Sequence, residues 1–419
     1  MRILLVEPDF PIPRKSRNHK NFLPIGLLKI GTYIKKSGRA TRLKLVIGNC
    51  RVGFIPDKIW ITSLFTYWST YFWDSVAFYR NAYPKSVIWI GGIYVSLHFN
   101  NEDFKEKCRR FRVKPYVGLH NKAENCLPNY KLVRQNPHQL DYQIIHSTRG
   151  CLRQCKFCYT WKLEPKRTSK KSIKRELCSN RLVFYDNNLL MNEHIDELLT
   201  EISGLKYKGR VVRCESQSGF DGKILEQRPE LAVALKKARF DSPKIAWDWG
   251  YDEFERIKKQ LDILVNASYH AEEISIFMIF NWDIPFVEME KKRLKCWEWK
   301  VQITDCRYRP VSQLHDNFDF YYPQTSKDYF IHPSWSDAEV KQFRRNVRRQ
   351  NICIRQGFRF HSASLERKRV DKELSMKARA LPKEEVLKMV SDAWFPDEIH
   401  MPPSTCWNPR LEQARRQNP

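Results

Sequence analysis

The sequence predicts an α/β protein built on parallel sheets. Up to about residue 130, and again between about residues 141 and 315, short apolar runs typical of strands alternate with apolar spacings typical of helices. Such alternation favours parallel strands with helices on both faces of the sheet. The 419 residues allow two or three domains, and the 13 Trp, 18 Tyr and 24 Phe are typical of a folded globular chain.

The N-terminal part begins with an apolar run that predicts a first strand over 3–7. Further strands are expected over 43–47, 59–65 and 86–90, the last stopped by Gly91 and Gly92. Residues 25–36 carry apolar side chains at helical spacing, and Gly38 is suited to end that helix.

The central part repeats a strand-helix pattern. Strands are expected over 142–147, 181–186, 211–215, 244–249, 273–280 and 301–307. The helix after the second strand is expected from about Asn192 to Gly204. The helix after the fourth places Asp252 and Glu255 at the spacing of a capping box.

Composition indicates where in the cell the protein is expected and what kind of partner its charge favours. No run of about 18 apolar residues is present, so no membrane span is expected. The first residues suit a strand and not a signal peptide, and cysteines without a secretory signal favour a reducing cytoplasm. The net charge of +27 is uneven, because residues 1–140 hold 24 Lys and Arg against 8 Asp and Glu. A basic surface favours polyanions such as nucleic acid, although solvated lysines on a soluble protein give the same excess.

Cys151, Cys155 and Cys158 form the most informative motif. Their spacing suits three irons of one [4Fe-4S] cluster, because thiolates are the usual ligands of such clusters. The next cysteine is Cys178, so one iron is left open for a substrate. The alternatives are a structural zinc site, which normally needs a fourth ligand from Cys or His, or buried free thiols.

The CxxxCxxC spacing, with Phe157 before the last cysteine and Thr148-Arg149-Gly150 before the first, resembles the radical S-adenosylmethionine (SAM) superfamily. The resemblance covers about residues 141–315. It implies that the open iron binds SAM, that reductive cleavage gives a 5′-deoxyadenosyl radical, and that a reductant of the flavodoxin or ferredoxin type supplies the electron. The radical then abstracts a hydrogen atom from a substrate that the sequence does not specify.

The resemblance also implies an architecture. The N-terminal part resembles the cobalamin-binding class of the superfamily, which implies a Rossmann-like (flavodoxin-like) domain over 1–135. A six-stranded partial (β/α)6 TIM barrel over 136–320 and a basic, mainly helical C-terminal extension over 321–419 follow. The DxHxxG motif that supplies a cobalt ligand is absent, since residues 7–11 read Glu-Pro-Asp-Phe-Pro and His19 lacks the required spacing. Cobalamin is therefore not the favoured cofactor, and a structural or substrate-docking domain is the preferred alternative.

In barrels of this kind the chemistry lies at the carboxyl ends of the strands. Residues at these strand ends are therefore further candidates for the cofactor-binding site. The turn after the second strand stands where the superfamily contacts the SAM amino group, although an Asn-rich turn that satisfies itself is the alternative. Polar groups after the third and fourth strands suit hydrogen bonds to SAM, and an arginine after the sixth suits its carboxylate. The predicted cofactor-binding residues are Phe157, Asp186, Asn187, Asn188, Glu215, Gln217, Asp248 and Arg307.

Two basic segments could indicate nucleic acid as a binding partner. Residues 162–175 hold seven basic residues and only Glu164 as an acid, and residues 341–380 hold 13 basic and three acidic ones with interleaved Phe343, Phe358 and Phe360. Basic and aromatic residues together suit single-stranded nucleic acid. A helix that packs its Phe side inward and exposes its Arg side has the same pattern, and we prefer that interpretation.

The sequence therefore predicts a radical SAM enzyme that acts on RNA, on a nucleic-acid-associated protein or on another substrate. A cobalamin-dependent radical SAM methyltransferase of a small molecule or peptide is one alternative. A non-catalytic protein that binds zinc or a structural cluster is the other. No pattern in the sequence bears on oligomeric state.

Overall fold

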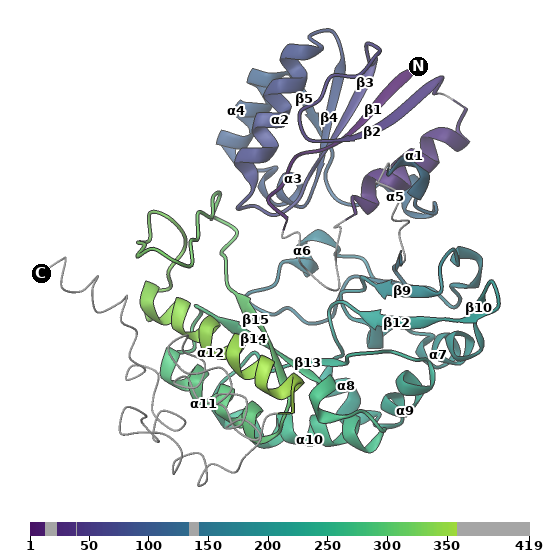
Figure 1. The fold of residues 1–419 in the computed structure, drawn as a ribbon. Helices are drawn as coiled ribbons and strands as arrows, with labels where there is room; N and C mark the ends of the chain where they lie inside the picture. The colour runs from purple at the N-terminus through teal and green to yellow at the C-terminus, as the bar shows by residue number, and fades with distance from the viewer. Residues whose placement is uncertain (13–22, 39, 134–141, 358–419) are drawn as a thin grey trace, which may run out of the picture. The chain divides into compact units, whose positions relative to one another are not determined.

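A computed structural model describes residues 1–12, 23–38, 40–133 and 142–357, and shows a mixed α/β protein with parallel sheets (Figure 1). The chain divides into two compact units. Unit 1 comprises Met1–Ile144, Arg149–Thr168 and Arg309–Asn317, and unit 2 comprises Ile145–Thr148, Ser169–Tyr308 and the residues from Phe318 onward. The predictions for His19, Phe358, Phe360 and the rest of the tail lie outside the described residues.

The described part of unit 1 holds a five-stranded sheet in the order β2-β1-β3-β4-β5, with every neighbouring pair parallel. Its strands are β1 (Arg2–Glu7), β2 (Arg42–Ile47), β3 (Lys58–Ser63), β4 (Val87–Gly92) and β5 (Val113–Pro115). The helices are α1 (Ile25–Lys36), α2 (Ser69–Ala82), α3 (Ile93–His98), α4 (Glu102–Phe111), α5 (Asn121–Glu124) and α6 (Thr160–Leu163), with a 3-10 turn η1 (Tyr130–Leu132).

Alternation along β1 builds two cores in unit 1. Leu4 and Val6 pack against α2 and α4, whereas Ile3 and Leu5 pack against α1. The helix α1 lies on the opposite face of the sheet from α2 and α4 (Figure 1). The predicted strands are confirmed within one or two residues at most ends, and α1 has the predicted bounds. Gly92 is required where β4 ends, because it has φ +103° and an added Cβ would lie 2.2 Å from the carbonyl oxygen of Ser63.

The predicted strands of unit 2 form two three-stranded sheets, in the orders β12-β9-β6 and β13-β14-β15. The chain enters unit 2 within β6, at Ile145. The strands are β6 (Gln143–Ile145), β9 (Arg181–Phe184), β12 (Arg213–Ser216), β13 (Lys244–Ala246), β14 (Ser275–Phe280) and β15 (Gln302–Arg307). Short strands are β7 (Thr148–Arg149), β8 (Thr168–Ser169), β10 (Lys206–Tyr207) and β11 (Arg210–Val211).

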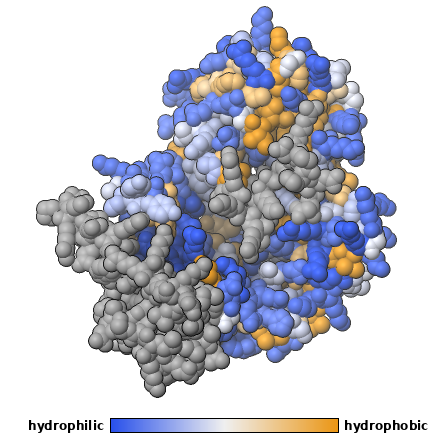
Figure 2. All heavy atoms as spheres, viewed as in Figure 1, coloured by the Kyte–Doolittle hydropathy of each residue, from blue (hydrophilic) through white to orange (hydrophobic). Residues whose placement is uncertain are grey.

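Helices of unit 2 follow the strands and bury one face each. They are α7 (Ile195–Gly204), α8 (Gly222–Gln227), α9 (Glu230–Lys237), α10 (Phe254–Asn266), α11 (Phe286–Glu298) and α12 (Asp337–Arg355), with 3-10 turns η2 (Lys174–Glu176), η3 (Leu189–Met191), η4 (Tyr251–Glu253) and η5 (Ala271–Glu273). The buried face of α11 and that of α12 include polar and charged side chains. The visible surface is mainly hydrophilic, with apolar residues in small patches (Figure 2). None of the helices in the described residues combines the length and apolar character that a bilayer span needs.

The predicted helix cap in unit 2 is wrong. Asp252 and Glu255 do not form a capping box, because η4 occupies the start of the predicted helix and α10 begins only at Phe254 without a side-chain cap. Glu288 of α11 accepts a hydrogen bond from the Tyr251 amide instead, at 2.6 Å. By contrast, α12 begins with a capping box between Ser336 and Glu339.

Glu7, at the carboxyl end of β1, predicts a measurable pH dependence of stability. Its side chain is 5% exposed, no hydrogen bond to the carboxyl group is found within the described residues, and burial raises its pKa to about 8. The folded state therefore holds the proton more tightly than the unfolded state, so Glu7 costs stability progressively as the pH rises from about 4.5 to about 8.

Replacing Glu7 with Gln removes that cost. We expect Glu7→Gln to unfold like the wild type near pH 4.5 and to be more stable by a few kcal/mol at pH 8. Urea unfolding of both proteins across this pH range measures the difference. A difference that stays constant with pH would contradict the assignment.

Candidate cofactor-binding loop and strand ends

The three cysteines of the predicted cluster motif lie in one loop of unit 1 that leads into α6. Cys151, Cys155 and Cys158 are half-buried cysteines. The loop turns on itself where the Cys158 amide donates to the carbonyl oxygen of Cys155 at 3.0 Å, and the Arg153 amide donates to Cys151 Sγ at 3.4 Å. By contrast, Cys214 of unit 2 is fully buried, and burial raises the pKa of its thiol.

The donor set of this loop fits an iron-sulfur cluster in chemistry and access. Three thiols are available within eight residues, and an amide donor to sulfur is one way in which proteins tune such clusters. Beside the loop, the buried indole nitrogen of Trp161 donates to no acceptor within the described residues. The structure does not gather any three Cys, His, Asp or Glu of its described residues into a metal-binding group.

Glu164 holds the two ends of the cysteine loop together. Its Oε1 accepts from Arg149 Nη1 at 3.0 Å and its Oε2 accepts from the Gly150 amide at 2.9 Å. Gly150 has φ +76°, and an added Cβ would lie 3.0 Å from the carbonyl oxygens of Glu164 and Lys166. A larger residue at position 150 would therefore push the returning chain away.

Arg149 is held from its other side by Glu124. Arg149 Nε and Nη2 donate to Glu124 Oε1 at 2.8 and 2.6 Å, and the buried Lys29 of α1 donates to the same oxygen at 2.8 Å. Burial opposes ionisation of Glu124, but the two cations outweigh it and hold its pKa below the ordinary value. The network Lys29–Glu124–Arg149–Glu164 thus fixes the chain just before the first cysteine.

In unit 2, Asp186 organises the residues that precede Arg149 in the chain. Its fully buried carboxylate accepts from the Ser147 amide at 2.7 Å, the Thr148 amide at 2.6 Å and the Ser147 hydroxyl at 2.8 Å. Asn192 adds a hydrogen bond to the carbonyl oxygen of Ser147 at 3.3 Å. These bonds tie the turn after β9 to residues 147–148.

The turn Asp186-Asn187-Asn188 is also tied to the next unit of the repeat. Asn188 Nδ2 donates to Asp221 Oδ2 at 2.8 Å, while Asp221 Oδ1 caps α8 by accepting from the Lys223 amide at 3.1 Å. The structure therefore shows the side chains of Asp186 and Asn188 in structural roles. Contact of Asp186, Asn187 or Asn188 with a cofactor stays a prediction.

Two predicted residues end β12. Glu215 forms an ion pair with Lys244 of β13 at 3.0 Å, which links the ends of two strands. The Gln217 amide donates to the carbonyl oxygen of Phe184 at 2.9 Å, and Gln217 Oε1 is buried without a donor in the described part of the chain. Because a buried acceptor without a donor costs about 1–3 kcal/mol, Gln217 is suited to a ligand hydroxyl or amine.

Asp248, just after β13, carries a desolvated carboxylate. Burial raises its pKa to about 6 against the opposing charge of Lys292, and no hydrogen bond to the carboxylate is found within the described residues. Lys292 of α11 is fully buried and donates to the carbonyl oxygens of Trp247 and Trp249, both at 2.7 Å, and burial lowers its pKa to about 8. Lys292 thus fixes the backbone on both sides of Asp248.

Arg307 ends β15 and is 8% exposed. Its guanidinium carbon lies 4.5 Å from the ring centroid of Phe318 and 4.9 Å from that of Tyr329.

The predicted site residues lie in three separate parts of the structure. Phe157 and the cysteines share a loop of unit 1, Asp186 to Asn188 and Glu215 to Gln217 end strands of one sheet of unit 2, and Asp248 and Arg307 end strands of the other.

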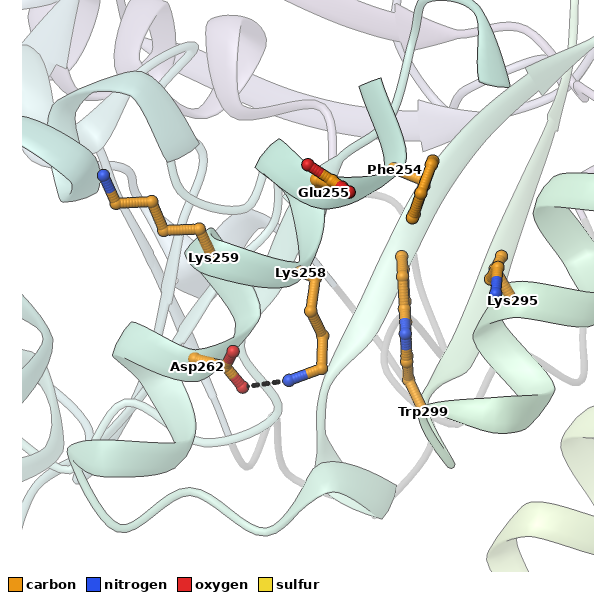
Figure 3. A pocket seen from close by; sticks show the side chains of 7 residues that line it. All are labelled: Phe254, Glu255, Lys258, Lys259, Asp262, Lys295 and Trp299. Carbon is orange, nitrogen blue, oxygen red and sulfur yellow. Dashed lines mark hydrogen bonds and ion pairs between the residues drawn. The ribbon is translucent and has the colours of Figure 1, made fainter. Parts of the chain in front are cut away.

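A surface pocket of about 300 Å³ lies elsewhere in unit 2, between α10 and the end of α11. Phe254 and Trp299 form one side, and Lys258 faces them while pairing with Asp262 (Figure 3). None of the predicted site residues lines it, although Trp299 stacks on Trp247, which directly follows β13, with ring centroids 5.6 Å apart.

Sequence reasoning assigned no role to Glu164 or Lys292. Both carried a weak signal: Glu164 is the only acid in a basic segment, and Lys292 falls between Met289 and Cys296 on the buried face of α11. Their partners lie 14 to 45 residues away in sequence, so spacing alone does not identify them.

Comparison with models of protein families and with curated protein sequences finds no match to this chain.

Asp186→Asn should loosen the turn that precedes the cysteine loop. The amide would present its NH2 group to backbone amide donors, so we expect a loss of about 2–4 kcal/mol in the free energy of unfolding, from broken charge-assisted hydrogen bonds at a buried site. Amide hydrogen exchange at Ser147 and Thr148 should accelerate. Asp262→Asn, at a side chain 48% exposed, is the matched control and should change little. Unchanged exchange at Ser147 and Thr148 would show that Asp186 does not hold this turn.

Proposed function

We propose that this protein is a radical SAM enzyme, in which Cys151, Cys155 and Cys158 hold a [4Fe-4S] cluster with one iron open to SAM. The observation that carries the proposal is the CxxxCxxC spacing on a single accessible loop. When bound, such a cluster delivers one electron to SAM. The chain's own residues then bind and orient SAM and the substrate.

The topology supports the proposed architecture. The strand order β2-β1-β3-β4-β5 in unit 1 is that of a flavodoxin-like, doubly wound sheet. In unit 2 the strands follow one another in chain order, β6, β9 and β12 and then β13, β14 and β15, as expected for a partial TIM barrel. We propose these two fold classes for the two units.

Polar groups at the strand ends of unit 2 support a role in binding SAM. Gln217 offers a buried acceptor oxygen, and Asp248 offers a carboxylate that Lys292 holds by its flanking backbone. Both suit the hydroxyl and amino groups of SAM. Arg307 is the proposed partner of the SAM carboxylate.

The proposal predicts 5′-deoxyadenosine from SAM. Anaerobically reconstituted protein with dithionite should release this product, and it should contain about four irons per chain with matching sulfide. Cys155→Ala should lose both the product and most of the iron. Cys178→Ala, which removes an exposed thiol outside the motif, should retain both.

Two results would contradict the proposal. One is zinc at about one ion per chain in place of iron and sulfide, which would indicate a structural site. The other is full iron content in the wild type with no 5′-deoxyadenosine under any reductant, which would indicate a cluster without radical SAM chemistry.

Glu164 should act on cluster retention without contacting the cluster. Glu164→Gln weakens the bonds to Arg149 and to the Gly150 amide, so we expect faster loss of iron to a chelator, by about tenfold. Absorbance of the cluster against time measures this loss. Glu197→Gln removes a carboxylate of a surface pair, 51% exposed, and is the control. Equal loss rates in both variants would show that the loop closure has no part in holding the cluster.

A further inference from the structure

The loop after β15 and the helix α12 of unit 2 form a surface that combines rings and guanidinium groups. Arg344 Cζ lies 5.5 Å from the ring centroid of Phe318, and Arg345 Cζ lies 5.4 Å from that of Phe320. Lys341 donates to the carbonyl oxygen of Tyr322 and so holds the loop against the helix. The segment 318–322 and the outer face of α12 are thus one continuous surface, named here the Tyr-Arg surface.

Two tyrosines on this surface are turned to solvent. Tyr321 is 70% exposed and Tyr322 is 69% exposed, which makes them the most exposed large hydrophobic residues in the described part of the chain. The ring of Phe320 meets Tyr321 edge to face, with centroids 5.7 Å apart. Adjacent exposed rings offer flat faces on which other aromatic groups can stack.

Positive charge is crowded on the same surface. Arg344 pairs with Asp305 at 3.2 Å, but Arg345 donates to the uncharged Gln342 at 2.8 Å. Burial together with the neighbouring Arg349 lowers the pKa of Arg345 to about 10. Arg348 is exposed beside them. Because burial and Arg349 disfavour the charge of Arg345 more than Asp337 favours it, a bound phosphate would stabilise that charge.

Phe343 of the same helix is fully buried, which confirms the prediction that its Phe side packs inward. On the other side of the helix, Arg344 and Arg345 lie against Phe318 and Phe320 of the loop, and Arg348 is exposed. The aromatic groups available to a ligand come from the loop, which sequence spacing on the helix did not predict.

We propose that the Tyr-Arg surface binds single-stranded RNA, with bases stacked on Tyr321 and Tyr322 and phosphates held by Arg345 and Arg348. Stacking on exposed rings requires unpaired bases, and cellular RNA offers these in loops and ends, whereas DNA is mainly duplex. The inference that RNA is the substrate class rests on the proposed function. Binding of RNA itself requires neither the cluster nor SAM.

Fluorescence anisotropy of a labelled oligouridylate of about 12 nucleotides tests the proposal with the full chain, across a salt series. The wild type should bind with an affinity that falls as salt rises. Tyr321→Ala/Tyr322→Ala should weaken binding at least tenfold, since each stacked base contributes about 1–3 kcal/mol. Arg345→Gln/Arg348→Gln should reduce the slope of log affinity against log salt by about 1–2.

The control removes the same charge elsewhere on unit 2. Lys206→Gln/Arg210→Gln alters an exposed hairpin, β10–β11, and should leave affinity and salt slope nearly unchanged. Unchanged unfolding midpoints establish that the variants fold. Absence of wild-type binding, full affinity in the double-tyrosine variant, or an equal loss in the control would overturn the proposal.

The two proposals fail separately. If 5′-deoxyadenosine forms but RNA does not bind, the Tyr-Arg surface is wrongly assigned and the chemistry stands. If RNA binds through these residues but iron and 5′-deoxyadenosine are absent, the binding surface stands and the proposed enzyme does not.

Discussion

Two carboxylates, Asp186 and Glu164, hold the chain on either side of the junction between Thr148 and Arg149. Asp186 accepts hydrogen bonds from the amides of Ser147 and Thr148 in unit 2. Glu164 accepts hydrogen bonds from the Arg149 side chain and the Gly150 amide in unit 1. Neighbouring strands do not pair all of the backbone amides at such a junction. A carboxylate has two oxygens and can accept hydrogen bonds from several of these amides at once. The cysteine loop begins directly after this junction. Charge-assisted hydrogen bonds therefore fix the chain at the point where this loop begins.

Among the described residues, charged groups are buried on helices, such as Glu290 and Arg293 of α11, and also where strands end. Glu7, Asp186 and Arg307 end or follow strands and are less than a tenth exposed. The middle of a strand pairs its own backbone groups, whereas the end leaves some of them for side chains. Burial without full pairing raises the pKa of Glu7 and Asp248 and lowers that of Lys292, so these positions cost stability in the free protein. Costly polar groups of this kind concentrate at binding sites in proteins generally.

Local pattern was sufficient for much of the fold. The bounds of α1 and the buried face of α7 follow from apolar spacing alone. β13 is shorter than predicted, because Lys292 takes the carbonyl oxygens of Trp247 and Trp249 and ends the ladder. The predicted capping box also fails because of a residue on α11. Glu288 accepts the hydrogen bond from the Tyr251 amide at the start of this segment. Of the candidate site, the cysteines and the strand ends were predictable, while Glu164 and Lys292 depend on partners distant in sequence. The exposed tyrosines depend on where the loop after β15 lies.

The central claim is that a three-cysteine loop leaves one iron of a four-iron cluster open to SAM. Mössbauer spectroscopy of protein reconstituted with ⁵⁷Fe, with and without SAM, tests it most directly. The account predicts that about one iron in four changes its isomer shift when SAM is added, and that the others do not. Irons that all remain unchanged on addition of SAM, or a spectrum that shows no four-iron cluster, would contradict it.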